Sequence, residues 1–130
     1  MACLVGRRLE RVVKRENDWV FSFGDEVALI VGAPWRLIVD GRNEFGDCDH
    51  DQQFGLPTPV NGIAETGRFV TGKSVKAVSI RTTGDLRLAF DDEAVREMIQ
   101  TSCGYEAWEL SAPKLKIVAQ GGGQLAIWKG

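Results

Sequence analysis

The chain has 130 residues, a common size for one domain, and its 44% apolar and 26% charged residues are typical of a globular protein rather than a disordered one. Sixteen basic and eighteen acidic side chains give a net charge of −2, which excludes a global positive field that would attract nucleic acid or an anionic membrane. We therefore expect a single folded domain with neither of these partners.

The sequence shows neither a targeting signal nor the cysteine spacing of a disulfide framework or metal site. No apolar run approaches the roughly 20 residues of a membrane-spanning helix, and the first eight residues lack the order of a secretory signal, which predicts a cytoplasmic protein. Cys3, Cys48 and Cys103 are odd in number, widely spaced and free of any Cys-x-x-Cys pair. This pattern argues against a disulfide framework or a zinc site, so we expect reduced thiols and no metal or other cofactor.

Most of the chain has the pattern of short strands and turns. Fifteen glycines separate segments rich in Val, Ile, Leu, Phe and Trp. In 19–23 and 86–90 apolar residues alternate with others, as in strands with one buried face. Further strands are predicted at 9–14, 27–31, 35–40, 75–81, 105–110, 114–118 and 125–129.

One short helix is predicted over 58–68. Thr58 can cap its first amides and Pro59 suits the first helical position, while Gly62 and Gly67 keep the helix short. The segment 92–100 fits either a helix or a strand, because its apolar residues fall on one helical face.

The two halves of the chain are similar in sequence. Gly6, Leu9 and Val12 match Gly72, Val75 and Val78, and the similarity continues over two further pairs of segments: 18–25 with 85–92, and 35–37 with 108–110. Two unrelated meanders of glycine turns and strands would also look alike, but the length of the match favours duplication.

We therefore predict a mainly β fold made of two packed antiparallel meanders, a sandwich or an open barrel-like arrangement, with the short helix near 58–68. The halves would span about 5–40 and 71–112, each a meander of four strands, with an acidic loop at 41–55 and the helix between them. This alignment favours a strand at 92–100 and places Trp35 and Trp108 at equivalent inward positions. Arg36 and Glu109 would then mark the same outer site in each half.

The segment Glu44–Asp51 is the densest group of potential ligands. Asp47, Asp49 and Asp51 alternate beside His50, an arrangement that can present carboxylates to a hard cation. The segment lacks the glycine and glutamate of a calcium-binding EF-hand loop, because Gln52 and Thr58 occupy those positions. A solvated loop whose aspartates cap turns is the favoured interpretation.

No catalytic set is evident in the sequence. His50 is the only histidine, and no serine lies in a Gly-x-Ser-x-Gly elbow. Segment 67–74 has the letters of a phosphate-binding loop and 121–123 is a run of glycines, but each precedes a predicted strand rather than the helix that such a loop needs.

A second group of candidate residues surrounds the predicted strand at 105–110. Glu106 shares the predicted inner face with Trp108, and a half-buried carboxylate requires a partner such as Arg36, Tyr105 or a ligand. An alternative function is a small-ligand site or a modest hydrolase between the sheets, which would use Arg36, Tyr105 and Glu106, with His50 and Asp51 at the rim.

Several segments resemble a family of small, uncharacterised bacterial proteins that are common in actinobacteria. Segment 105–109, followed by the glycine turn and Trp128, also resembles small immunity-type proteins that neutralise toxins. The resemblance implies a binding protein with no established catalytic residues. It rests on segments 19–24, 35–37, 84–90, 104–110 and 121–128.

We therefore expect a non-enzymatic interaction protein, with an immunity protein that blocks a toxin as the leading hypothesis. The acidic loop could meet a basic nuclease surface through charge complementarity. A homodimer formed through an exposed sheet edge is a further possibility. The candidate binding residues are Arg36, Asp47, Asp49, His50, Asp51, Tyr105, Glu106 and Trp108.

Overall fold

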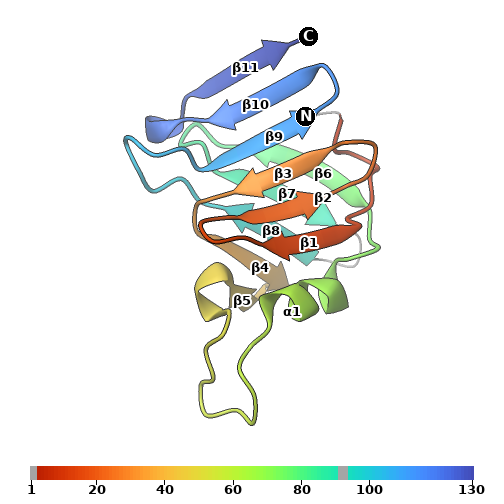
Figure 1. Cartoon of the computed structure of the whole chain (residues 1–130), viewed down its shortest axis with the longest axis vertical. Helices are drawn as coiled ribbons and strands as arrows, with labels where there is room; N and C mark the ends of the chain where they lie inside the picture. Colours follow the sequence, from red (N-terminus) through yellow and green to blue (C-terminus); the bar gives the residue numbers. More distant parts are fainter. Residues whose placement is uncertain (1–2, 91–93) are drawn as a thin grey trace.

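A computed structural model describes residues 3–90 and 94–130, which form two antiparallel sheets packed face to face (Figure 1). The first sheet has the order β1 (Arg11–Lys14), β2 (Trp19–Ser22), β3 (Ala28–Val31), β9 (Trp108–Ala112), β10 (Leu115–Ala119) and β11 (Leu125–Lys129). The second has the order β5 (Arg42–Gly46), β4 (Trp35–Val39), β8 (Ala94–Met98), β7 (Leu86–Phe90) and β6 (Val75–Ile80). The predicted mainly β fold with one short helix is confirmed.

Alternating side chains on the facing surfaces of the two sheets form the core. Trp35 on β4 and Trp108 on β9 are both buried, as the sequence comparison predicts. The disputed segment is a strand, because Ala94 and Met98 on β8 are buried at alternate positions in the same core. Asp91, Asp92 and Glu93 lie outside the described residues.

The strand order differs from the prediction that each half forms its own four-stranded meander. β1–β2–β3 and β6–β7–β8 are three-stranded meanders in opposite sheets, but the next strand of each half crosses over: β4 pairs with β8, and β9 pairs with β3. The two crossovers have matching registers, since Trp35 lies opposite Met98 and Trp108 lies opposite Val31. Each sheet is therefore completed by the other half of the chain.

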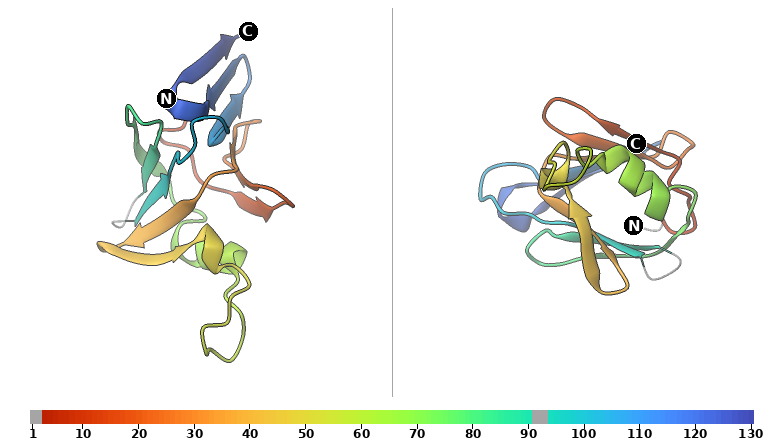
Figure 2. Two further views of the ribbon diagram at one scale, coloured as in Figure 1. Left: turned by 90° about the vertical axis from the view of Figure 1, so that its left-hand side faces the viewer. Right: turned by 90° about the horizontal axis from the view of Figure 1, so that it is seen from below.

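The helix α1 (Gly62–Phe69) begins later than predicted. Its cap is Asn61, whose side-chain oxygen accepts hydrogen bonds from the backbone amides of Ile63 at 3.0 Å and Ala64 at 3.1 Å. Asparagine is a strong N-cap, whereas Thr58 lies in the preceding loop. Seen from below, α1 lies between the two sheets, and it packs against β1 (Figure 2).

The segment predicted as an acidic loop at 41–55 contains two short elements. It begins with β5, which pairs with β4 across a bulge, and continues with the 3₁₀ turn η1 (Asp47–Asp49). In the second half, β10 is followed by the 3₁₀ turn η2 (Gly121–Gly123) and then by β11. Gly72, Lys73 and Ser74 lead into β6, so neither glycine-rich segment precedes a helix. In the described part of the chain, no helix has the length and apolar character needed to cross a membrane.

Candidate functional site

The segment between β5 and α1 projects from the end of the sandwich opposite β11 (Figure 1). Two of its aspartates hold its base in place. The Asp47 side chain accepts a hydrogen bond from the Trp35 amide at 3.0 Å, and the Asp49 side chain accepts one from the Gly46 amide at 2.9 Å. These carboxylates therefore act as turn caps, as the favoured interpretation of the loop predicts.

His50 joins this loop to α1. Its Nδ1 accepts a hydrogen bond from the Gly62 amide at 2.9 Å, which places the ring proton on Nε2. The ring packs edge-on against Trp19, with centroids 5.2 Å apart, and Nε2 lies 3.6 Å from the exposed Asp51 carboxylate. His50 thus positions the first turn of the helix. Among the described residues, no three His, Cys, Asp or Glu side chains are placed to hold a metal ion.

Beyond this base the loop ends in an apolar tip. The Asp51 amide donates to the Val60 carbonyl and the Val60 amide donates to the Gln52 carbonyl, both at 2.8 Å, which forms a short stem. Past the stem, Phe54 is 66% exposed and Leu56 is 50% exposed. These two side chains give the tip of the loop an exposed apolar surface.

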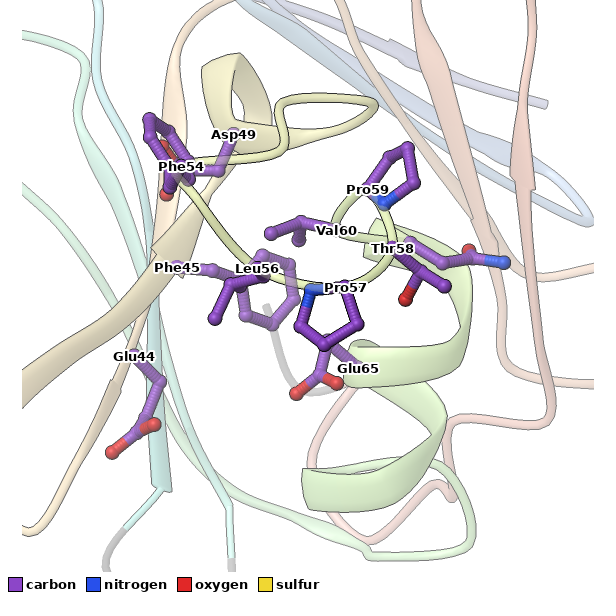
Figure 3. Close-up of a pocket in the computed structure, with 11 residues that line it drawn as sticks. Glu44, Phe45, Asp49, Phe54, Leu56, Pro57, Thr58, Pro59, Val60 and Glu65 are labelled. Atoms are coloured by element: carbon purple, nitrogen blue, oxygen red, sulfur yellow. The ribbon is translucent and has the colours of Figure 1, made fainter.

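The loop encloses a pocket of about 560 Å³ against β5 and α1 (Figure 3). Apolar side chains line its centre, and the charged side chains that line it are the carboxylates of Glu44, Asp49 and Glu65; no Lys or Arg is among the lining residues. Glu65 also lies 3.6 Å from Arg68 on the exposed side of α1. The apolar lining consists of Phe45, Phe54, Leu56, Pro57, Pro59 and Val60. The pocket therefore combines an apolar surface with negative charge.

The other predicted site residues are not gathered at this pocket. Arg36 lies on the outer face of the second sheet, where it pairs with Glu97 at 2.7 Å, and Glu109 pairs with Lys116 at 2.8 Å on the outer face of the first sheet. Glu106 is exposed rather than half-buried, because it precedes β9 and lies in a groove of about 280 Å³ on that outer face. Tyr105 is 82% exposed.

Trp108 belongs to the core rather than to a surface. Its indole Nε1 donates a hydrogen bond to the Gly84 carbonyl at 2.9 Å. Its apolar ring is buried between the sheets, so the residue stabilises the fold.

The charged residue that sequence reasoning missed is Arg96 on β8. It points into the core, is only 1% exposed, and its guanidinium lies over two aromatic rings, 3.3 Å from the centroid of Phe21 and 4.1 Å from that of Trp35. Burial lowers the pKa of Arg96 well below its ordinary value. The alternation Ala94, Arg96, Met98 within the predicted strand is the signal that could have identified it.

Comparison with known proteins gives one match. No curated protein and no solved structure matches the chain. The model of a family of unknown function, DUF6188, matches residues 2–129, nearly the whole chain. The chain therefore belongs to this family of unknown function, DUF6188.

Proposed function

We propose that this chain is a non-enzymatic protein-binding domain that holds its partner at the pocket between the projecting loop, β5 and α1. The observation that carries the proposal is the lining of that pocket, which combines apolar side chains, most of them exposed, with three carboxylates and no cation. A partner that fits has an apolar side chain next to Lys or Arg, since burial of apolar area supplies affinity and opposite charge supplies orientation and rate.

We further propose that this partner is a basic toxin domain and that the chain is a bacterial immunity protein acting in the cytoplasm. The resemblance of the segment Tyr105–Trp128 to immunity-type proteins supports this assignment, as does the excess of carboxylates at the pocket. A nuclease toxin binds phosphate with a basic surface, and such a surface is complementary to an acidic, apolar pocket.

Growth of cells that express a toxin encoded next to this gene tests the proposal. Co-expression of the wild-type chain should restore growth, and Leu56→Asp should abolish the protection because it places a charge in the apolar centre of the pocket. Ile127→Asp is the matched control, since Ile127 is 53% exposed on β11, at the opposite end of the molecule. Failure of the wild type to protect against any neighbouring toxin, or equal protection by both variants, would contradict the proposal.

The geometry does not favour the alternative of a small-ligand site or hydrolase between the sheets. Arg36 and Glu106 lie on the outer faces of different sheets, and Tyr105 is exposed to solvent. The space between the sheets is filled by core side chains and by Arg96.

A specific observation favours a second partner, another copy of this chain at β11. Along the inner face of the first sheet, Leu110 and Ile117 lie in one cross-strand row with Ile127, and the first two are buried. β11 extends past the edge of the second sheet (Figure 1), so the strands of that sheet do not cover its inner face. Ile127, at the end of the row, is therefore 53% exposed, and Leu125 is 38% exposed. Antiparallel pairing of two β11 edges about a twofold axis would continue this row into the partner.

Sedimentation of the purified chain over a range of concentrations tests this pairing. The wild type should form dimers, Ile127→Asp should be monomeric, and Leu56→Asp should dimerise as the wild type does. A wild type that stays monomeric at its highest soluble concentration, or an Ile127→Asp variant that still dimerises, would exclude the β11 interface.

A further inference from the structure

Three arginine side chains come together on the outer face of the second sheet. In one cross-strand row, Glu97 on β8 lies between Arg87 on β7 and Arg36 on β4. In the next row, the Arg81 amide donates a hydrogen bond to the Asp85 carbonyl at 2.9 Å, at the turn between β6 and β7. Asp85 lies two residues before Arg87, so the side chains of both rows share one face of the sheet.

The two rows surround a hollow of about 120 Å³. Their five charged side chains line it together with Leu86 and Ile99. One water molecule needs roughly 10–15 Å³ of such space, so the hollow has room for a ligand of several non-hydrogen atoms. None of the lining residues belongs to the acidic pocket between the projecting loop and α1.

Both carboxylates of the hollow already have partners. Glu97 Oε1 accepts a hydrogen bond from Arg36 Nε at 2.8 Å and lies 2.7 Å from its Nη2. Asp85 Oδ1 accepts a hydrogen bond from the Gln100 amide at 2.9 Å, just after β8. Glu97 therefore neutralises Arg36, and Asp85 fixes the chain that follows β8.

The other two arginines have N–H donors without acceptors. Arg87 Nε lies 4.0 Å from Glu97 Oε2, which is too long for a hydrogen bond. Arg81 is exposed, and its side chain forms no ion pair or hydrogen bond within the part of the chain that the structure describes. Three guanidinium groups and two carboxylates leave the hollow with one excess positive charge.

The free donors of two arginines suit a phosphate group better than a carboxylate. Each guanidinium presents its N–H groups in a planar fork that matches two oxygens of either anion. A carboxylate has only two oxygens and one charge, which one arginine satisfies. A phosphate group has at least three terminal oxygens and a charge of about −1.5 to −2 at pH 7, so it can bond two arginines at once.

We propose that the hollow between Arg81 and Arg87 binds a phosphate group, either as the free ion or on a small phosphate monoester. Both guanidinium groups donate hydrogen bonds to its oxygens, and Arg36 adds positive charge from the far side of Glu97. The row of Arg87, Glu97 and Arg36 is complete without Arg81, so the sheet itself does not require the third arginine. This site is separate from the acidic pocket, and its loss would leave the proposed protein-binding function intact.

Titration of the whole chain with sodium phosphate at pH 7, followed in ¹H–¹⁵N spectra, tests the proposal. The ionic strength is held constant with sodium chloride. The backbone cross-peaks of Arg87 and Ile99 should move with phosphate concentration and saturate. Arg81→Met should raise the dissociation constant about tenfold or more, because it removes charge-assisted hydrogen bonds to the ion.

Arg42→Met is the matched control. It removes the same charge from an exposed position on β5 of the same sheet, outside the hollow, and should bind phosphate as the wild type does. Because the Arg81 side chain contacts no partner in the described residues, its replacement should leave the fold and the unfolding midpoint unchanged.

Two further ligands define the chemistry of the site. Sodium acetate at the same ionic strength should bind about tenfold more weakly than phosphate, since it engages one arginine. Retained binding of methyl phosphate assigns the site to a phosphate monoester, and binding of inorganic phosphate alone assigns it to the free ion. Cross-peaks that do not respond to phosphate, an unchanged dissociation constant in Arg81→Met, or equal affinity for acetate and phosphate would overturn the proposal.

Discussion

Trp35 and Trp108 occupy matching positions on β4 and β9, but only one of the two indole N–H groups has a partner. Trp108 donates to the Gly84 carbonyl at 2.9 Å, whereas Nε1 of Trp35 is buried without a partner among the described residues. Removing a buried hydrogen bond and leaving its acceptor unpaired costs about 1–3 kcal/mol.

We therefore expect Trp108→Phe to lower the free energy of unfolding by about 1–2 kcal/mol more than Trp35→Phe. Urea denaturation of both variants measures the difference. Equal losses would show that the Gly84 hydrogen bond contributes nothing to stability.

The two glycines of α1, Gly62 and Gly67, differ in the space that a Cβ would find. A Cβ on Gly62 would lie 2.8 Å from Cη2 of Trp19 and 3.3 Å from Nδ1 of His50, whereas a Cβ on Gly67 would meet nothing closer than 3.9 Å. Gly62→Ala should destabilise the chain by about 1–3 kcal/mol through overpacking. Gly67→Ala should stabilise it by about 0.5–1 kcal/mol through helix propensity. Chemical denaturation tests both signs, and a Gly62→Ala variant as stable as the wild type would contradict the tight contact with His50 and Trp19.

At the scale of residues, the sequence predicts which side chains are buried better than it predicts which side chains form ion pairs. The alternation of apolar residues places Trp35 and Trp108 correctly in the core. It does not predict that Arg36 pairs with Glu97, because that contact depends on the crossover of β4 beside β8. Arg96 was missed because a charged residue in a strand is ordinarily assigned to the solvent face.

At the scale of elements, the β1–β2 hairpin contains an ion pair that makes stability depend on pH. The Arg15 guanidinium bonds both Asp18 oxygens, at 2.5 and 2.7 Å. The side-chain hydrogen bond from Arg15 is the main cause that lowers the pKa of Asp18 from its ordinary value. Because the pKa in the folded chain is below that in the unfolded chain, the contribution is present above about pH 4 and disappears as the pH falls below it.

Asp18→Asn should therefore reduce stability at pH 7 by only about 0.2–1 kcal/mol, since Arg15 is half exposed, and should have a still smaller effect at pH 3. Denaturation of both proteins at the two pH values gives the comparison. A larger loss at pH 3 than at pH 7 would contradict the sign derived from the Asp18 pKa.

The elements themselves follow from local patterns where those patterns are strong. The strands at 19–22, 86–90 and 125–129 are found where alternation or apolar runs place them. β5 was missed because its residues Arg42–Gly46 are mostly polar and exposed, as an edge strand allows. The helix begins at Gly62 because Asn61 and His50 together satisfy its first amides, and the His50 contact depends on the folded loop.

At the scale of the whole molecule, the two ends of the sandwich are different. One end has the projecting loop, the acidic pocket and α1, while the other has the exposed edge of β11 (Figure 1). The sequence places the densest group of potential ligands in the segment after the first half. It does not predict the pocket, because Glu44, Phe45 and Glu65 come together only when β5 and α1 pack against the loop.

Calorimetric titration of the chain with a basic toxin domain encoded beside its gene tests most directly whether the acidic, apolar pocket binds the proposed basic partner. We predict that the complex forms and that its affinity falls with added salt. Leu56→Asp should reduce the affinity by about 2 kcal/mol or more, which is roughly 30-fold, whereas Ile127→Asp should leave the affinity unchanged. No heat of binding with the wild-type chain, or an affinity unaffected by Leu56→Asp, would contradict the claim.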